Sequence, residues 1–180
     1  PKFLSIMPRA YIALGGNLGD VRRTLNDAVT ELCTRINTRL LARSSDYRTP
    51  PWGELDQPPF VNGCICIETN RAPHALLAEL HIVERLFGRD RAHERRWGPR
   101  TLDLDLIAYD DVAIDTADLI LPHPRLFERA FVLLPLAEIA PHLVIAGRSV
   151  NEAARAIDAS GIEKLPGCVS DHDADPRKGS

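Results

Sequence analysis

The chain has 180 residues, of which 44% are hydrophobic and 26% charged, as in an ordinary soluble globular protein. This length favours a single domain over residues 1–165, followed by a polar C-terminal tail over residues 166–180. The formal net charge of −3 argues against a general nucleic-acid-binding protein. Because no apolar run approaches membrane-spanning length and no signal peptide is apparent, we expect a cytoplasmic protein without a membrane partner. We also expect a monomer without a nucleic-acid partner.

The pattern of apolar residues predicts the order of strands and helices. Short apolar or alternating runs predict strands at residues 11–14, 40–47, 60–68, 101–109 and 112–114. Apolar residues at helical spacing predict helices over residues 21–32, 73–87 and 130–139, the last interrupted by Pro135. The main order, β-α-β-β-α-β, predicts a ferredoxin-like α+β sandwich, an antiparallel sheet with helices on one face and a short extra hairpin.

Two loops between these elements have unusual compositions. Residues 48–59 contain four prolines, so this loop is expected to be irregular but stiff. Residues 88–98 are polar and form the best candidate for a mobile lid. Six arginines stand between Arg85 and Arg100, an excess of positive charge that suits a small anion. Since the chain has no G-x-x-x-x-G-K-[ST] motif, arginines, backbone amides and a metal would have to hold any phosphate.

Asp103 and Asp105 occupy alternate positions of a predicted strand. Alternate side chains share a face, so the two carboxylates point the same way while the leucines from Leu102 to Leu106 face the core. Unpaired carboxylates this close would resist ionisation, and a hard divalent cation would remove that difficulty. The alternative interpretation is an edge strand with a solvated acidic face, but the preceding residues 96–100 (RWGPR) favour a phosphate site.

The four cysteines, Cys33, Cys64, Cys66 and Cys168, include no C-x-x-C pair. Cys64 and Cys66 alternate along an apolar run, which places them on the same side of a predicted strand. We interpret the cysteines as buried free thiols, with a zinc site as the alternative.

Four segments together carry a family resemblance: residues 11–20 (YIALGGNLGD), 44–53 with 56–62 (SSDYRTPPWG and DQPPFVN), 96–105 (RWGPRTLDLD) and 121–131 (LPHPRLFERAF). With these segments the chain closely resembles the 6-hydroxymethyl-7,8-dihydropterin pyrophosphokinase family of folate biosynthesis, from about Arg9 to Pro141. The resemblance implies a ferredoxin-like fold and an ATP-dependent diphosphotransferase. It further implies two Mg²⁺ ions and transfer of the β,γ-pyrophosphate of ATP to the pterin hydroxymethyl group, with release of AMP.

The resemblance also implies roles for particular residues. Asp103 and Asp105 would be the metal ligands and would act in catalysis together with Arg89 and Arg100. The residues implied in ATP binding are His81, Glu84, Arg91, Trp97, Leu106, His123 and Arg129. The residues implied in pterin binding are Thr49, Pro50, Trp52, Phe60, Asn62 and Phe131, with the two phenylalanines stacked on the ring. Considered without the family, Phe60 and Phe131 would be core residues, and Arg85, Arg95 and Arg96 are equally well explained as solvated or ion-paired side chains.

The chain departs from the family pattern at two places. The loop from Gly88 to Trp97 is one residue longer than in the best-known members, which puts the register of Arg89 and Arg91 in doubt. Asp118 and Ile120 stand where nucleotide-contacting basic or hydroxyl residues often occur. Either departure would weaken contacts to ATP without altering the chemistry.

Two non-catalytic alternatives are compatible with a ferredoxin-like fold, because that fold hosts many functions. The first is a regulatory module that senses a nucleotide through the arginine-rich loop. The second is an RNA-binding domain, which would need exposed sheet aromatics and a basic surface, and the sequence has neither the motif nor the charge.

Overall fold

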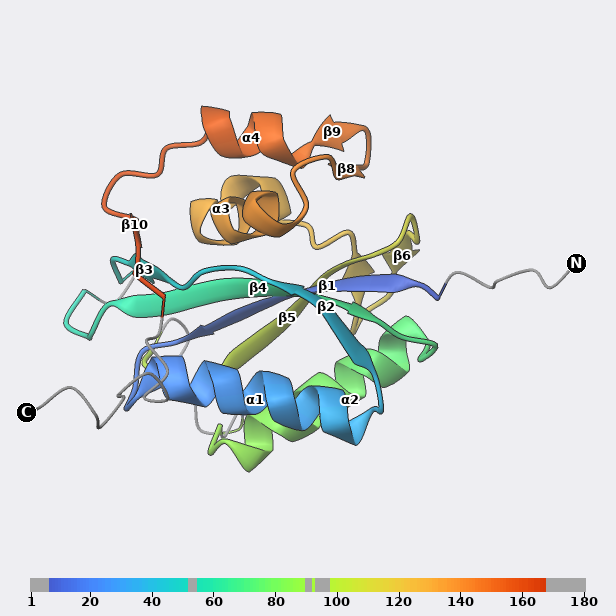
Figure 1. Cartoon of the computed structure of the whole chain (residues 1–180), viewed down its shortest axis with the longest axis horizontal. Helices are drawn as coiled ribbons and strands as arrows, with labels where there is room; N and C mark the ends of the chain where they lie inside the picture. The colour runs from blue at the N-terminus through green and yellow to red at the C-terminus, as the bar shows by residue number, and fades with distance from the viewer. Residues whose placement is uncertain (1–6, 52–54, 90–91, 93–97, 168–180) are drawn as a thin grey trace, which may run out of the picture.

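The computed structural model describes residues 7–51, 55–89, 92 and 98–167. At its centre lies a six-stranded antiparallel sheet (Figure 1). Its strands are β1 (Arg9–Gly16), β2 (Arg39–Arg43), β3 (Tyr47–Thr49), β4 (Phe60–Glu68), β5 (Asp103–Tyr109) and β10 (Glu163–Lys164). The strands follow one another in the order β10-β3-β4-β1-β5, and β2 pairs with β4 on the same side as β3. The predicted ferredoxin-like sheet is therefore confirmed.

Helices cover both faces of the sheet, whereas the sequence predicted helices on one face only. The two helices of the ferredoxin-like core, α1 (Val21–Arg35) and α2 (Pro73–Leu86), lie on one face. On the other face, α3 (Ala130–Ile139) packs on β4, and α4 (Val150–Ala156) packs on α3 (Figure 1). The single-face prediction was wrong because the strands are apolar on both sides, and each apolar face needs a cover.

Each face of the sheet has its own hydrophobic core. Toward α1 and α2, residues such as Ile12, Ile65 and Leu104 are almost fully buried. Toward α3, Cys64 and Cys66 are buried in a second cluster with other apolar side chains. The prediction that these two cysteines are buried free thiols on one side of a strand is confirmed. Among the described residues, no group of three or more His, Cys, Asp or Glu side chains is placed to hold a metal ion.

The segment predicted as one strand over residues 40–47 is divided into β2 and β3. Between them the chain leaves the ladder at residues 44–46, where the Ser44 hydroxyl accepts a hydrogen bond from the Cys64 amide at 2.9 Å. The Asp46 carboxylate is buried and forms ion pairs with Arg22 at 2.8 Å and Arg43 at 3.1 Å. These polar contacts interrupt the strand between β2 and β3, although the Ser44 amide still donates to the Cys64 carbonyl at 2.9 Å, and the apolar pattern alone did not indicate the break.

Helix α3 continues through Pro135, where the sequence predicted an interruption. Val132, Leu133 and Leu136 are buried against the sheet, and this packing stabilises the helix across the hydrogen bond that proline lacks. The predicted return strand at residues 112–114, after a turn at residues 110–111, does not pair with β5. A short hairpin forms further along the described chain instead, where β6 (Ile114–Asp115) pairs with β7 (Ile120–Leu121).

The remaining short elements complete the fold without extending the main sheet. They are the 3₁₀ turn at Leu126–Glu128 and a hairpin of β8 (Val144–Ile145) and β9 (Arg148–Ser149). Most of the predicted tail, residues 168–180, lies outside the described residues, and the predicted boundary at residue 165 stays a prediction. None of the helices in the described ranges has the length and apolar character needed to cross a bilayer.

Candidate active site

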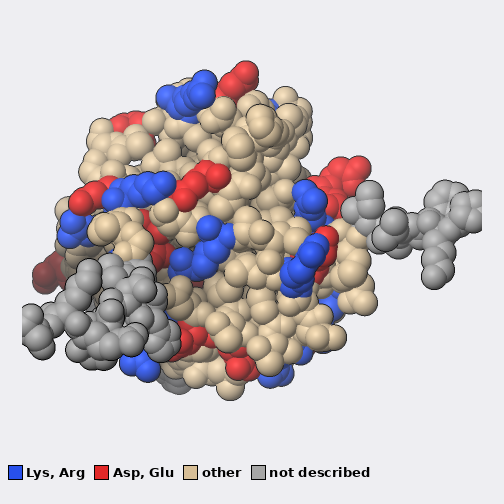
Figure 2. Space-filling view, viewed as in Figure 1, with Lys and Arg blue, Asp and Glu red and all other residues tan. Residues whose placement is uncertain are grey.

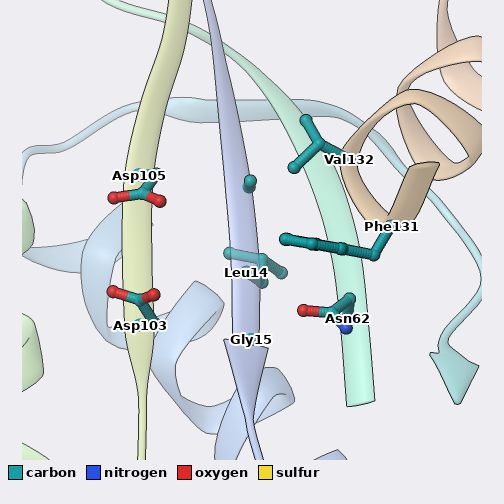
Figure 3. Close-up of a pocket in the computed structure, with 8 residues that line it drawn as sticks. Leu14, Gly15, Asn62, Asp103, Asp105, Phe131 and Val132 are labelled. Atoms are coloured by element: carbon teal, nitrogen blue, oxygen red, sulfur yellow. The ribbon is translucent and has the colours of Figure 1, made fainter. Parts of the chain in front are cut away.

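The two aspartates of β5 face the α3 side of the sheet, as the alternation predicted. Leu102, Leu104 and Leu106 are at most 3% exposed and lie in the core beneath α1 and α2. Asp103 and Asp105 therefore point to the opposite face, where both carboxylates line a narrow cavity (Figure 3). One strand thus buries a stripe of leucines on one face and presents two carboxylates side by side on the other.

Arginines pair with these carboxylates, whereas the sequence led us to expect a metal ion beside the acids and the arginines on phosphate. Arg100 Nη1 lies 3.0 Å from Asp103 Oδ2. The other oxygen of Asp103 accepts a short hydrogen bond from Arg89 Nη1. Burial opposes ionisation of Asp103, but the two guanidinium groups outweigh it and lower the pKa of its carboxyl. Asp103 is therefore an ionised group held between two cations.

Glu84 of α2 holds the Arg89 side chain in place by an ion pair. Its Oε1 atom lies 2.5 Å from Arg89 Nη1 and accepts a hydrogen bond from the Leu104 amide at 2.8 Å. Glu84 is fully buried and Arg89 is only 7% exposed. The expectation that Glu84 contacts ATP directly is not supported, because its carboxylate is occupied inside the protein. Arg89, expected on a mobile loop, is instead fixed at the end of α2 by carboxylates on two sides.

Asp105 is in a different electrostatic environment from its neighbour. Burial and the charge of Asp103 raise the pKa of Asp105 to about 7, because Arg129 only partly offsets them. The nearest atoms of Arg129 and Asp105 are 3.6 Å apart, a looser pair than those around Asp103. A second carboxylate that resists ionisation beside an ionised one is a donor set that a hard cation would stabilise, so the residues present fit a magnesium ion.

His123 is held as a neutral hydrogen-bond donor next to this cluster. Its backbone amide donates to the Ile107 carbonyl at 2.8 Å, and its Nδ1 atom accepts from the Arg125 amide at 3.1 Å. Because Nδ1 is an acceptor, the ring proton resides on Nε2. Burial, together with the charges of Arg129 and Arg125, lowers the pKa of His123 to about 4.

The opposite wall of the cavity carries the residues expected to bind a flat ring. Asn62 of β4 and Phe131 of α3 line it, with Leu14 and Gly15 of β1 between them and the aspartates (Figure 3). A Cβ atom on Gly15 would lie 2.7 Å from Asn62 Oδ1, so glycine allows the amide to approach the β1 backbone. The guanidinium of Arg129 lies 5.8 Å from the centre of the Phe131 ring and links the two halves of the site.

Asn17 is a site residue that the sequence reasoning missed. Its Oδ1 atom accepts a hydrogen bond from the Arg100 amide, and its Nδ2 atom donates to Gln57 Oε1 and to the Pro58 carbonyl, each at 2.9 Å. It therefore joins the segment bearing Arg100 to the proline-rich loop. The signal was the asparagine that ends the Gly-Gly-Asn turn, a residue type that commonly bonds to nearby backbone.

The structure brings most of the predicted site residues together. Asn62, Asp103, Asp105 and Phe131 share the cavity, and Arg89, Arg100 and Arg129 contact its aspartates. Phe60 is half-buried and pairs in register with Thr49, His81 is half-buried on α2, and Pro50 is exposed. The Leu106 side chain lies in the core, so any contact with ATP would have to come from its backbone. Trp52, Arg91 and Trp97 lie outside the described residues.

The fold and the site together define a ferredoxin-like α+β domain whose sheet presents carboxylates and arginines beside an amide and an aromatic ring, an arrangement suited to a phosphate-transferring enzyme. The chain matches the model of the family described as 7,8-dihydro-6-hydroxymethylpterin-pyrophosphokinase over residues 11–141, and it belongs to this family. The resemblance noted from the sequence and the prediction of an ATP-dependent diphosphotransferase are thereby confirmed. Membership of an enzyme family argues against both non-catalytic alternatives.

Curated relatives in three bacteria are named 2-amino-4-hydroxy-6-hydroxymethyldihydropteridine pyrophosphokinase. The relative from Methylorubrum extorquens is 50% identical over 159 residues, 88% of this chain and 99% of its own. The relative from Pseudomonas aeruginosa is 43% identical over 163 residues, 90% of this chain and 99% of its own. The relative from Bacillus subtilis is 46% identical over 130 residues, 72% of this chain and 77% of its own.

Solved structures agree on the fold. The crystal structure of wild-type Plasmodium falciparum HPPK-DHPS with pteroate superposes with a TM-score of 0.65 over 83% of this chain, at 13% identity. A structure of HPPK-DHPS in complex with substrates gives a TM-score of 0.66 over 84% of this chain, at 12% identity. The present chain spans 42% and 43% of those longer chains. At such identities the likeness establishes the ferredoxin-like fold alone.

Proposed function

We propose that this protein transfers the β,γ-pyrophosphoryl group of ATP to the hydroxymethyl group of 6-hydroxymethyl-7,8-dihydropterin, with Mg²⁺, and releases AMP. The observation that supports this most is the shared cavity, in which Asp103 and Asp105 face Asn62 and Phe131. A phosphate-directed half and a ring-directed half in one space are what a transfer between a nucleotide and a pterin requires. The family to which the chain belongs is described as a pyrophosphokinase for this pterin, which supports the proposal.

The phosphate half consists of cations that stay charged when water is excluded. Arg100 and Arg129 lie beside the aspartates with their side chains about one-fifth exposed, at 19% each. Planar guanidinium groups bind phosphate oxygens bidentately, so these two arginines would orient the triphosphate. His123, neutral with its proton on Nε2, would donate one further hydrogen bond to a phosphate oxygen. Arg89, fixed by Glu84, would hold Asp103 in place while adding positive potential.

The pterin half consists of one amide and two aromatic rings. Asn62 presents a donor and an acceptor on one side chain, which suits the amino-oxo edge of a pterin. Phe131 and Phe60 would stack on the two faces of the ring, each worth about 1 kcal/mol beyond its burial. Backbone groups at Pro50, which follows Thr49, would complete the contacts to the amino-oxo edge of the pterin.

The chemistry proposed is a single displacement at phosphorus. The pterin hydroxyl oxygen forms a bond to the β-phosphorus of ATP, the bond from that phosphorus to the α,β-bridging oxygen breaks, and AMP leaves with that oxygen. The hydroxyl proton is released to solvent, and no residue is assigned as a general base. Asp103 and Asp105 would hold the Mg²⁺ ions, which supply charge neutralisation on the triphosphate and a lowered pKa for the hydroxyl.

A product assay tests this proposal. Incubation with ATP, Mg²⁺ and 6-hydroxymethyl-7,8-dihydropterin should yield AMP and the pterin diphosphate in equal amounts, and accumulation of ADP would contradict it. Asp103→Asn should lower turnover by at least about 100-fold, because the ionised ligand is lost. Asp111→Asn, an exposed aspartate in the turn after β5, is the matched control and should keep wild-type turnover.

We also propose that the enzyme works as a cytoplasmic monomer on these two small molecules. On the face shown in Figure 2, Lys and Arg side chains lie next to Asp and Glu side chains and do not gather into one basic patch. Mixed charge of this kind suits a small anionic ligand held in a cleft rather than a nucleic acid. Light scattering at working concentration checks the oligomeric state, and a dimer mass would contradict the monomer.

A further inference from the structure

A C-terminal arm, residues 158–167, lies along the outer edge of the sheet beside β3. Within it, β10 pairs with β3 in antiparallel register, Glu163 opposite Arg48 and Lys164 opposite Tyr47 (Figure 1). The Leu165 amide then donates to the Asp46 carbonyl at 2.8 Å. Strand β3 has only three residues, and it depends on its neighbours for its position. The arm gives this short strand a partner on its second side.

Side-chain contacts also hold the arm against residues 46–48 and against α3. Arg48 and Glu163 form an exposed ion pair at 2.5 Å, and Lys164 Nζ lies 3.3 Å from Glu138 Oε2. Arg22 joins the end of the arm to Asp46, because its Nη2 atom donates to the Pro166 carbonyl at 2.7 Å and its Nε atom to Asp46 at 2.8 Å.

Glu138 of α3 binds residues 45–47 from the α3 side of the sheet. Its carboxylate accepts hydrogen bonds from the Ser45 amide at 3.0 Å, the Ser45 hydroxyl at 2.9 Å and the Tyr47 hydroxyl at 2.6 Å. Burial opposes its ionisation, but these donors and Lys164 outweigh it and lower the pKa of Glu138. Helix α3, which begins next to Phe131, is thus tied both to β3 and to the arm.

The arm also touches the pterin-directed loop directly. At Gly161 the backbone has a φ of +77°, and a Cβ atom added there would lie 2.8 Å from Pro50 Cγ. Pro50 follows Thr49, whose hydroxyl accepts a hydrogen bond from the Asn62 amide at 2.9 Å. The glycine therefore allows the arm to pack against Pro50, the residue that follows β3, one residue away from the contact between Thr49 and the Asn62 amide.

We propose that the arm is a positioning element for pterin binding, with Gly161 as its contact residue. This inference rests on the proposed function, since it assumes that Asn62 and Pro50 meet the pterin. The arm contacts β3 and Pro50 and thereby fixes the position of Thr49. The Thr49 hydroxyl in turn fixes the orientation of the Asn62 amide. The arm acts on the pterin half only, because the arm and β5, which carries the two aspartates, lie at opposite edges of the sheet.

The test compares two glycine substitutions that impose the same backbone strain. Gly161→Ala introduces a methyl group against Pro50, whereas Gly147→Ala, at a φ of +75°, introduces one with no atom within 4 Å. The measurements are calorimetric affinity for 6-hydroxymethyl-7,8-dihydropterin, affinity for a non-hydrolysable MgATP analogue, and the thermal unfolding midpoint. We expect Gly161→Ala to weaken pterin binding by about fivefold or more beyond Gly147→Ala, and ATP-analogue binding to change less than about twofold.

A second pair of variants separates a local effect from general destabilisation. In a Pro50→Ala background, which lacks the Cγ atom, Gly161→Ala should cost little further pterin affinity, so the two substitutions should be strongly non-additive. Leu165→Pro, which removes the hydrogen bond to Asp46, should also weaken pterin binding selectively.

The outcomes distinguish this inference from the proposed function. If the wild-type chain binds the pterin but Gly161→Ala loses no more affinity than Gly147→Ala, the positioning role is overturned while the function stands. Equal losses of pterin and ATP-analogue affinity would also overturn it. If the wild-type chain neither binds the pterin nor releases AMP from ATP when the pterin is supplied, the proposed function fails, and the positioning role fails with it.

Discussion

The side-chain amide of Asn62 donates a hydrogen bond from Nδ2 to the Thr49 hydroxyl oxygen, 2.9 Å away on the neighbouring strand. Both residues are buried, and this bond decides which end of the amide faces the cavity. The Oδ1 atom lies close to the β1 backbone at Gly15. A threonine with no charge and no place in the reaction thereby orients the group proposed to recognise the pterin edge.

Thr49→Val should weaken pterin binding by about tenfold, because the isosteric side chain leaves the buried Asn62 amide without its acceptor. The affinity for an ATP analogue should stay close to that of the wild type, since the aspartates and arginines are untouched. Isothermal titration of both ligands checks this. Thr34→Val, at an exposed position of α1, is the control; an unchanged pterin affinity in Thr49→Val would disprove the orienting role.

Glu84→Gln should destabilise the fold by about 2–3 kcal/mol, because it removes the buried negative charge that faces Arg89. Turnover should fall as well, since Arg89 also positions Asp103. Urea unfolding measures the stability and the AMP assay measures the turnover. Glu128→Gln, with a side chain 65% exposed, should change neither quantity. A fully stable Glu84→Gln variant would show that the Arg89 charge is compensated elsewhere.

His123 should make the folded state less stable as the pH falls from about 6.5, its unfolded pKa, toward 4. Its pKa is about 4 in the folded protein, where burial disfavours the cation most, Arg129 and Arg125 add to this, and Asp103 favours the cation. Within this window the unfolded chain binds more protons, so protonation favours unfolding, by up to about 1.4 kcal/mol per pH unit.

Urea unfolding at a series of pH values checks the His123 prediction. His123→Gln should lose less stability than the wild type between pH 6.5 and pH 4.5, by about 1 kcal/mol after allowing for the partial exposure of the ring. His142→Gln, at an exposed position, should follow the wild-type curve. Parallel curves for His123→Gln and the wild type would contradict a depressed pKa.

Asp105→Asn should stabilise the ligand-free protein by only about 0.5–1 kcal/mol, because it removes one of two neighbouring half-buried carboxylates and the Asp105 side chain is 35% exposed to screening solvent. The same variant should lose the increase in unfolding temperature that MgATP gives the wild type, and EDTA should abolish that increase in the wild type. Scanning calorimetry with and without MgATP separates the two effects. A destabilised ligand-free Asp105→Asn variant would mean that the contact with Arg129 outweighs the repulsion from Asp103.

Local patterns predicted the parts of the site that depend on neighbouring residues. The alternation of leucines with Asp103 and Asp105 was enough to place two carboxylates on one face of a strand. The apolar spacing located α1, α2 and β4, and the motif set indicated the family. The same patterns failed where distant residues decide the outcome: the break between β2 and β3 depends on Asp46 meeting Arg22, and the continuity of α3 depends on packing against the sheet.

The sequence by itself determined that Asp103 and Asp105 lie on one face of a strand, because strand geometry places residues two positions apart on the same side. Only the tertiary structure decided their charge partners. Arg89 turns inward to Glu84, and Arg129 reaches Asp105 from a segment that begins α3. The arm that supports Thr49 and Pro50 likewise pairs residues more than a hundred positions apart. Such contacts form only when the whole chain packs, since each depends on where other elements place its two partners.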